Sequence, residues 1–195
     1  MAKNMSQNPE VTKKSPAKMI AIIVGIIVVL LAAWMLIQPL FIKKEAKNTD
    51  SITYVNYQDP ETGATLQYPS SWSKIESQPG AVNFAEKSGA NVAFVIEDLS
   101  ANPMTLQEYT EASLESLKSL DIGFQLTKSY SSTTAGYPSY TIEYTAENGS
   151  LKAQATGVWF ITGNKAYILT YTAPVDEYEA NMTSAKKIID SIKVK

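Results

Sequence analysis

The sequence predicts an α+β domain, an antiparallel β-sheet flanked by helices, preceded by a single transmembrane helix. Three observations lead to this expectation. Apolar residues fill the stretch 19–42 almost without interruption, residues 140–147 and 151–161 alternate between apolar and polar side chains, and two further segments repeat apolar residues at intervals of three and four. The chain has 195 residues, which suits one domain with a short appendage.

Residues 19–42 form the predicted membrane anchor. Only Gly25, Gln38 and Pro39 among these 24 residues lie outside the apolar set, and none is charged. The uninterrupted part, Met19–Ile37, would span about 28 Å as a helix at about 1.5 Å per residue, close to the roughly 30 Å hydrocarbon core of a bilayer. It is longer than the apolar region of a cleaved signal peptide, about 7–15 residues. We therefore expect an uncleaved anchor.

Lysines flank the anchor on both sides. The tail 1–18 carries four Lys against one Glu, a net charge of +3, and three more Lys lie in the linker 43–51. The positive-inside rule slightly favours a cytoplasmic tail, which would place the domain 52–195 outside the cell membrane. The alternative is the reverse orientation, with a cytoplasm-facing adaptor domain that binds a protein partner.

The expected strands follow from alternation and from turn residues between them. Asn148-Gly149 and Gly163-Asn164 are turn pairs that link the last three strands into an antiparallel meander. The Ser/Thr cluster Ser129–Thr134 and the segment Ser71–Lys74 are interpreted as loops. The expected strands are 52–57, 64–68, 81–86, 92–98, 124–130, 140–147, 151–161 and 165–172.

Two helices are expected to cover the two faces of this sheet. Residues 92–96 are apolar on both sides, so each face needs a covering layer. The first helix begins at a capping box formed by Thr105 and Glu108. The second begins near Pro174–Asp176, and its apolar residues recur at intervals of four and three.

Composition excludes several kinds of chemistry. All 17 basic residues are Lys, and the chain has no Arg, His or Cys, so thiol, imidazole and zinc-finger sites are absent. Residues 43–195 carry 13 Lys against 18 acidic residues, a net charge of −5 that would repel a phosphate backbone. Nucleic-acid binding is therefore not expected.

Short motifs give little support for catalysis. Ser71-x-x-Lys74 and Lys87-Ser88-Gly89 match elements of penicillin-binding enzymes, but they lie only 13 residues apart and the first follows Pro69 in an expected loop. A hydrolase based on carboxylates or a Ser–Lys pair is the less favoured alternative. The expected helix carries Glu108, Glu111 and Glu115 on one face, and a solvated face is favoured over a cation site. We expect no enzyme activity, cofactor or metal.

Aromatic residues are the most suggestive feature for binding. Eleven Tyr residues fall largely on or beside the expected strands. A Tyr-rich core is the default interpretation, and a groove for a protein or small-ligand partner is the alternative. The candidate contact residues are Tyr68, Trp72 and Tyr137. For Trp72 the preferred interpretation is a structural lid over one end of the core.

The order of these features resembles the PsbP-like family. The resemblance rests on Tyr68-Pro69-Ser70-Ser71-Trp72, on Gly136-Tyr137-Pro138-Ser139-Tyr140 and on Asn164-Lys165-Ala166-Tyr167-Ile168-Leu169-Thr170, followed by a final helix. It covers about residues 52–195. It implies an α/β/α sandwich and a non-catalytic accessory or binding role. The metal binding of the photosynthetic branch relies on His, which this chain lacks.

Overall fold

The computed structural model describes residues 52–78 and 80–195. The expected tail 1–18, the anchor 19–42 and the linker 43–51 lie outside the described residues. Within the described part, no helix has both the length and the apolar character needed to cross a membrane.

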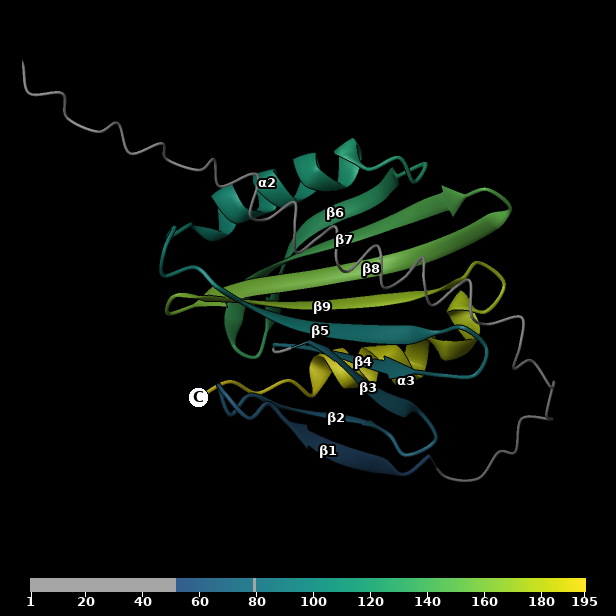
Figure 1. Cartoon of the computed structure of the whole chain (residues 1–195), viewed down its shortest axis with the longest axis horizontal. Coiled ribbons are helices and arrows are strands. Elements are labelled where there is room, and N and C mark those ends of the chain that lie inside the picture. Colours follow the sequence, from purple (N-terminus) through teal and green to yellow (C-terminus); the bar gives the residue numbers. More distant parts are fainter. Residues whose placement is uncertain (1–51, 79) are drawn as a thin grey trace, which may run out of the picture.

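The described chain forms one seven-stranded antiparallel sheet, a separate two-stranded hairpin and two helices (Figure 1). The strand order of the large sheet is β3-β4-β5-β9-β8-β7-β6, and the small sheet pairs β1 with β2. The strands are β1 (Tyr54–Gln58), β2 (Thr65–Pro69), β3 (Ser73–Gln78), β4 (Ala81–Ala85), β5 (Asn91–Asp98), β6 (Gln125–Thr134), β7 (Tyr137–Asn148), β8 (Leu151–Thr162) and β9 (Lys165–Pro174). The helices are α2 (Leu106–Ser119) and α3 (Tyr178–Asp190).

The predicted meander of the last three strands is confirmed. β7, β8 and β9 pair in sequence order, and their registers run without a break. Gly149 and Gly163 take positive φ angles of 63° and 58° in the two connecting turns. This backbone conformation is the reason that glycine-containing pairs mark such turns.

The face of the sheet under α3 holds the larger core. Apolar side chains from β4, β5, β8 and β9 pack there against the buried face of α3 and against β2. The backbone of Lys193, after α3, pairs with Thr65 of β2 through two hydrogen bonds of 2.8 and 2.9 Å. The hairpin and the helix thus cover this face together.

The opposite face carries α2, and the predicted capping box at its start is confirmed. The Glu108 N–H donates to the Thr105 hydroxyl at 3.2 Å, and the Thr105 N–H donates to the Glu108 carboxylate at 2.8 Å. Tyr109 and Leu117 of α2 are buried against side chains of β7 and β8. The prediction that helices cover both faces is correct.

Three element predictions were wrong in detail. The Ser/Thr cluster expected to be a loop continues β6 to Thr134, and the segment from Ser73, also expected to be a loop, forms β3. Both are edge strands, and most of their described side chains are exposed, so neither shows the alternation that burial imposes on a strand. The final helix begins at Tyr178, because Pro174–Glu177 form a turn closed by a 2.9 Å hydrogen bond.

Candidate functional site

Four chain connections meet at one end of the sheet, the left-hand end in Figure 1. They join β1 to β2, β5 to α2, β6 to β7 and β8 to β9. The Leu99 N–H donates to the Asn164 carbonyl oxygen at 2.7 Å, which ties the second connection to the fourth. We call this surface the loop end.

A stack of aromatic rings supports the loop end. The Tyr137 and Phe160 rings are 5.7 Å apart and nearly parallel, and the Phe160 and Tyr167 rings are 5.1 Å apart with a similar orientation. The three rings come from the neighbouring strands β7, β8 and β9. Phe160 is fully buried and Tyr137 is half-buried. Such stacked pairs stabilise the packing of neighbouring strands beyond the burial of their area.

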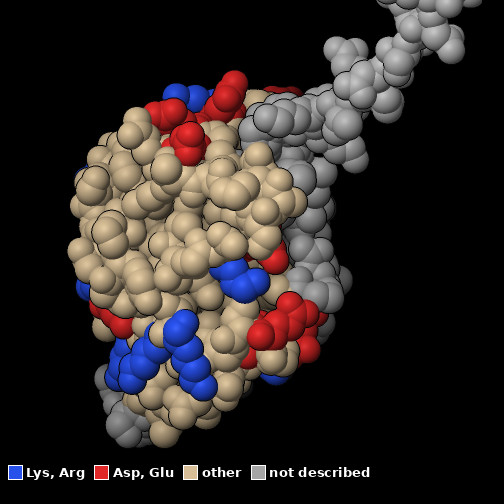
Figure 2. Space-filling model, turned by 90° about the vertical axis from the view of Figure 1, so that its left-hand side faces the viewer, with Lys and Arg blue, Asp and Glu red and all other residues tan. Residues whose placement is uncertain are grey.

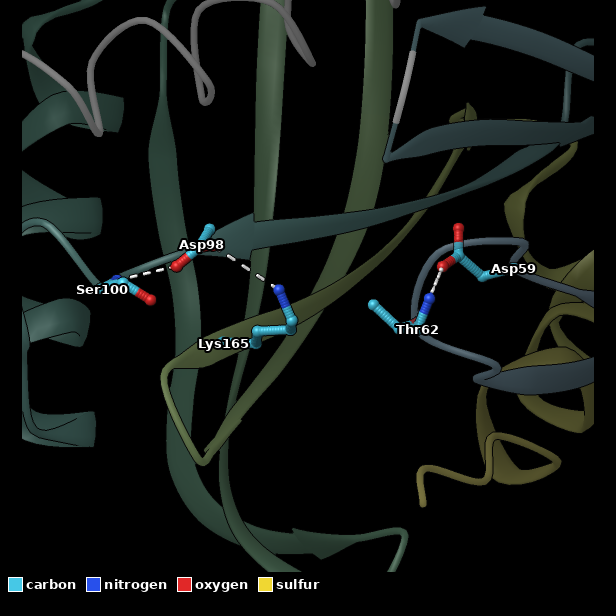
Figure 3. Close-up of polar contacts among 5 residues, drawn as sticks. All are labelled: Asp59, Thr62, Asp98, Ser100 and Lys165. Carbon is cyan, nitrogen blue, oxygen red and sulfur yellow. Dashed lines mark hydrogen bonds and ion pairs between the residues drawn. The ribbon is translucent and has the colours of Figure 1, made fainter.

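Asp59 holds the turn between β1 and β2. Asp59 is 4% exposed, and its carboxylate accepts hydrogen bonds from the Thr62 N–H at 2.8 Å and the Thr62 hydroxyl at 2.7 Å (Figure 3). Burial, together with the nearby Asp59 and Glu76 charges, raises the pKa of Tyr57 to about 12. Burial and then the Asp59 charge also raise the pKa of Tyr167. The hydrogen bonds of the Asp59 carboxylate to Thr62 therefore stabilise the turn between β1 and β2.

Asp98, at the end of β5, forms a second polar cluster. The Ser100 N–H donates to its carboxylate at 2.8 Å, and the Lys165 ammonium lies 3.6 Å from its other oxygen. Hydrogen bonds from Ser100, with a smaller contribution from Lys165, hold the pKa of Asp98 below its usual value. Figure 3 shows Asp59 in the turn between β1 and β2 and Asp98 at the end of β5, each directed at its own partners. Residues 52–78 and 80–195 contain no group of three or more acidic side chains placed to hold a metal ion.

Three of the four connections at the loop end are uncharged, and the one between β1 and β2 carries Asp59 and Glu61. Figure 2 shows the loop end facing the viewer, with a broad area free of charged side chains between acidic groups above and lysines and acidic groups below. The segments 99–104, 129–142 and 161–164 contain no Asp, Glu or Lys. Their exposed residues include Ala101, Pro103, Gly136, Pro138 and Asn164. Depletion of charge is typical of the centre of a protein–protein interface.

The three aromatic candidates from the sequence do not share one surface. Tyr137 lies at the loop end, whereas Trp72 follows β2 at the other end of the hairpin, where Pro69 pairs with Tyr54 (Figure 1). Tyr68 is half-buried, and its ring centre lies 4.5 Å from that of Phe84. Trp72 is only 6% exposed and belongs to the core under α3.

Sequence analysis missed a buried acidic residue on β5. Glu97 is 4% exposed, and its carboxylate accepts a 2.8 Å hydrogen bond from the hydroxyl of Tyr109 on α2. Burial raises the pKa of Glu97, and the hydrogen bond from Tyr109 offsets part of this rise. The sequence does contain a signal for this burial. Side chains alternate between the two faces of β5, so Glu97 lies on the same face of the sheet as Val95 and Ala93.

We expect ionisation of Glu97 to lower the free energy of unfolding as pH rises. The folded-state pKa of Glu97 lies above its ordinary value of 4.5, so the favourable contribution of the protonated form is complete below that value and is lost as pH rises through the folded pKa. Glu97→Gln keeps an acceptor for Tyr109 but cannot ionise. In urea denaturation at several pH values, the variant should gain stability over the parent as pH rises above 4.5. A difference that stays constant with pH would contradict this.

The fold and the similarity to a known family together define the class of this protein. It has an antiparallel sheet with two helices of the PsbP-like type, as the resemblance implied. The chain belongs to the DcrB family, whose model matches residues 64–191. No curated protein sequence matches it.

Solved structures from bacteria and from yeast share this fold. The cyanobacterial PsbP (CyanoP) of Synechocystis sp. PCC 6803 has a TM-score of 0.55 and 15% identity, covering 78% of this chain and 98% of that chain. LpqN of Mycobacterium tuberculosis, described as involved in cell envelope biogenesis, has a TM-score of 0.53 and 15% identity, covering 75% and 92%. The Ran-binding protein Mog1p of Saccharomyces cerevisiae has a TM-score of 0.55 and 8% identity, covering 74% and 96%. At these identities the similarity shows the fold alone.

Proposed function

We propose that residues 52–195 form a non-catalytic binding module that recognises a protein partner outside the cell membrane, and that residues 19–42 anchor it there. The observation that carries the binding role is the absence of charge from three of the four connections at the loop end, above the stack of Tyr137, Phe160 and Tyr167. A partner that docks there need not strip water from charged groups, which is the main cost of burying a polar surface.

The solved structures give this proposal limited support. Mog1p is described as a Ran-binding protein, so one protein with this fold presents a surface to a protein partner. LpqN is described as acting in cell envelope biogenesis, which agrees with a role outside the membrane. Both are too distant to supply a partner for this chain.

The binding surface can be tested with a photo-cross-linking amino acid. Placed in the full chain at Ala101 or Pro138, both exposed at the loop end, it should give the same cross-linked product with a partner in cells. Placed at Ser150, exposed in the turn between β7 and β8 at the opposite end, it should not. Asn164→Asp, which adds a charge to an exposed position of the loop end, should reduce the product, whereas Asn164→Gln should keep it. Equal products from all three probe positions would reject the loop end as the interface.

The membrane topology can be tested with protease. Added to intact cells or spheroplasts, protease should remove the residues beyond about residue 45 and leave a small membrane-bound fragment, because an external domain is accessible and an inserted helix is not. Immunoblotting with tags at each end of the chain would follow both products. Digestion that requires cell lysis would show the reverse orientation, a domain facing the cytoplasm.

A further inference from the structure

β6 is an open edge of the seven-stranded sheet. Among residues 52–78 and 80–195, its one strand neighbour is β7. Every side chain from Gln125 to Ser131 is exposed, and Leu126 and Tyr130 are among the exposed large hydrophobic residues. An edge strand offers unpaired backbone N–H and C=O groups to another strand, so proteins usually block such edges.

The other edge of the sheet carries those blocking features. β3 presents Lys74 and Glu76, which pair at 2.7 Å, and its register shifts between Glu76 and Gln78. Charged side chains and irregular pairing both hinder the addition of a strand. β6 has one shift, between Leu126 and Lys128, and beyond it the pairing with β7 is regular from Ser129 to Thr134.

The regular part of β6 lacks a blocking group. Residues 129–134 include no charged residue and no proline. The one nearby charge, Lys128, forms an ion pair of 3.0 Å with Glu143 of the neighbouring strand. The hydroxyl of Ser132 bonds to those of Ser139 and Thr141 at 2.7 and 2.8 Å, which fixes β6 against β7. This part of β6 is therefore an extended, uncharged edge that can pair with another strand.

We propose that the segment Ser129–Thr134 of β6 pairs antiparallel with the same segment of a second copy of this chain, joining two sheets across a two-fold axis. The second copy is the occupant because the segment is uncharged and so does not repel itself. Antiparallel pairing continues the arrangement of all seven strands of the sheet. A two-fold axis lets the same segment of both copies form the contact. Opposing Tyr130 and Ser/Thr side chains form the type of cross-strand pair that stabilises such contacts.

Cysteine cross-linking tests this contact directly, because the chain has no cysteine of its own. Ser131→Cys, near the middle of the segment and exposed, should give a cross-linked dimer when the full chain in membranes is treated with a short bismaleimide. The matched control is Ser73→Cys, an exposed serine on the opposite edge strand β3. It should give far less dimer. Equal cross-linking at both positions would reflect random collision and overturn the proposal.

A charge added to the edge should abolish the dimer without unfolding the chain. Thr133 is exposed and takes no part in the hydroxyl contacts of Ser132. Thr133→Lys, combined with Ser131→Cys, should lose most of the cross-linked product, and Thr133→Gln, similar in length but neutral, should keep it. Both variants should retain the parent's thermal melting curve. Cross-linking that survives Thr133→Lys in a folded chain, or a folded Ser131→Cys chain that gives no dimer, would overturn the proposal.

Discussion

Replacing Trp72 with alanine should lower the free energy of unfolding by about 3–5 kcal/mol, the usual cost of truncating a buried aromatic side chain. Trp72 is 6% exposed and lies in the core under α3. The loss is a large part of the roughly 5–15 kcal/mol that stabilises a typical domain. Urea denaturation followed by far-ultraviolet circular dichroism would measure it without relying on the fluorescence of the residue removed.

The matched control is Trp72→Phe, which keeps an aromatic ring in the same space. It should lose less stability than the alanine variant, because a smaller cavity remains. The competing interpretation treats Trp72 as a contact for a partner. A Trp72→Ala variant that unfolds at the parent's urea concentration and no longer binds the partner would establish that interpretation and refute the structural one.

Replacing Phe160 with alanine should also cost about 3–5 kcal/mol of stability. Phe160 is fully buried, and its ring is stacked between those of Tyr137 and Tyr167, so the substitution removes both ring contacts. Each aromatic pair adds about 0.5–1.5 kcal/mol beyond the burial of its area. The same denaturation measurement checks this value.

Two further variants separate the role of the stack in folding from a role in binding. Phe160→Leu keeps most of the apolar volume and should cost less than Phe160→Ala. Tyr137→Ala removes a half-buried outer ring and should also cost less. If Tyr137→Ala leaves stability almost unchanged but abolishes partner cross-linking at the loop end, Tyr137 is a contact residue. A loss as large as that of Phe160→Ala would make it a core residue.

The candidate site was only partly predictable. Tyr137 was identified from the sequence as an aromatic residue that could meet a partner, and it does lie at the loop end. The uncharged segments 99–104 and 161–164 are visible in the sequence, but nothing local indicates that they adjoin. Their contact, between Leu99 and Asn164, follows from the pairing of β5 with β9. That pairing joins segments about seventy residues apart, as the register of Val95 with Ile168 shows.

By itself the sequence determined those elements whose signals are local. The capping box of Thr105 and Glu108, the turns at Gly149 and Gly163 and the meander they join all follow from short-range hydrogen bonding and backbone geometry. The same holds for the two covered faces of β5, because burial on both sides favours an unbroken apolar run such as residues 92–96.

Only the tertiary structure decided the features that depend on neighbours distant in sequence. The position of β9 between β5 and β8, the edge position of β3 and β6, and the burial of Asp59 and Glu97 are such features. An edge strand buries neither face fully, so its sequence carries no alternation to reveal it. A buried acidic residue needs a hydrogen-bond partner, and for Glu97 that partner is Tyr109 of α2, twelve residues further along the chain. These features arise from packing between elements, which no short stretch of sequence encodes.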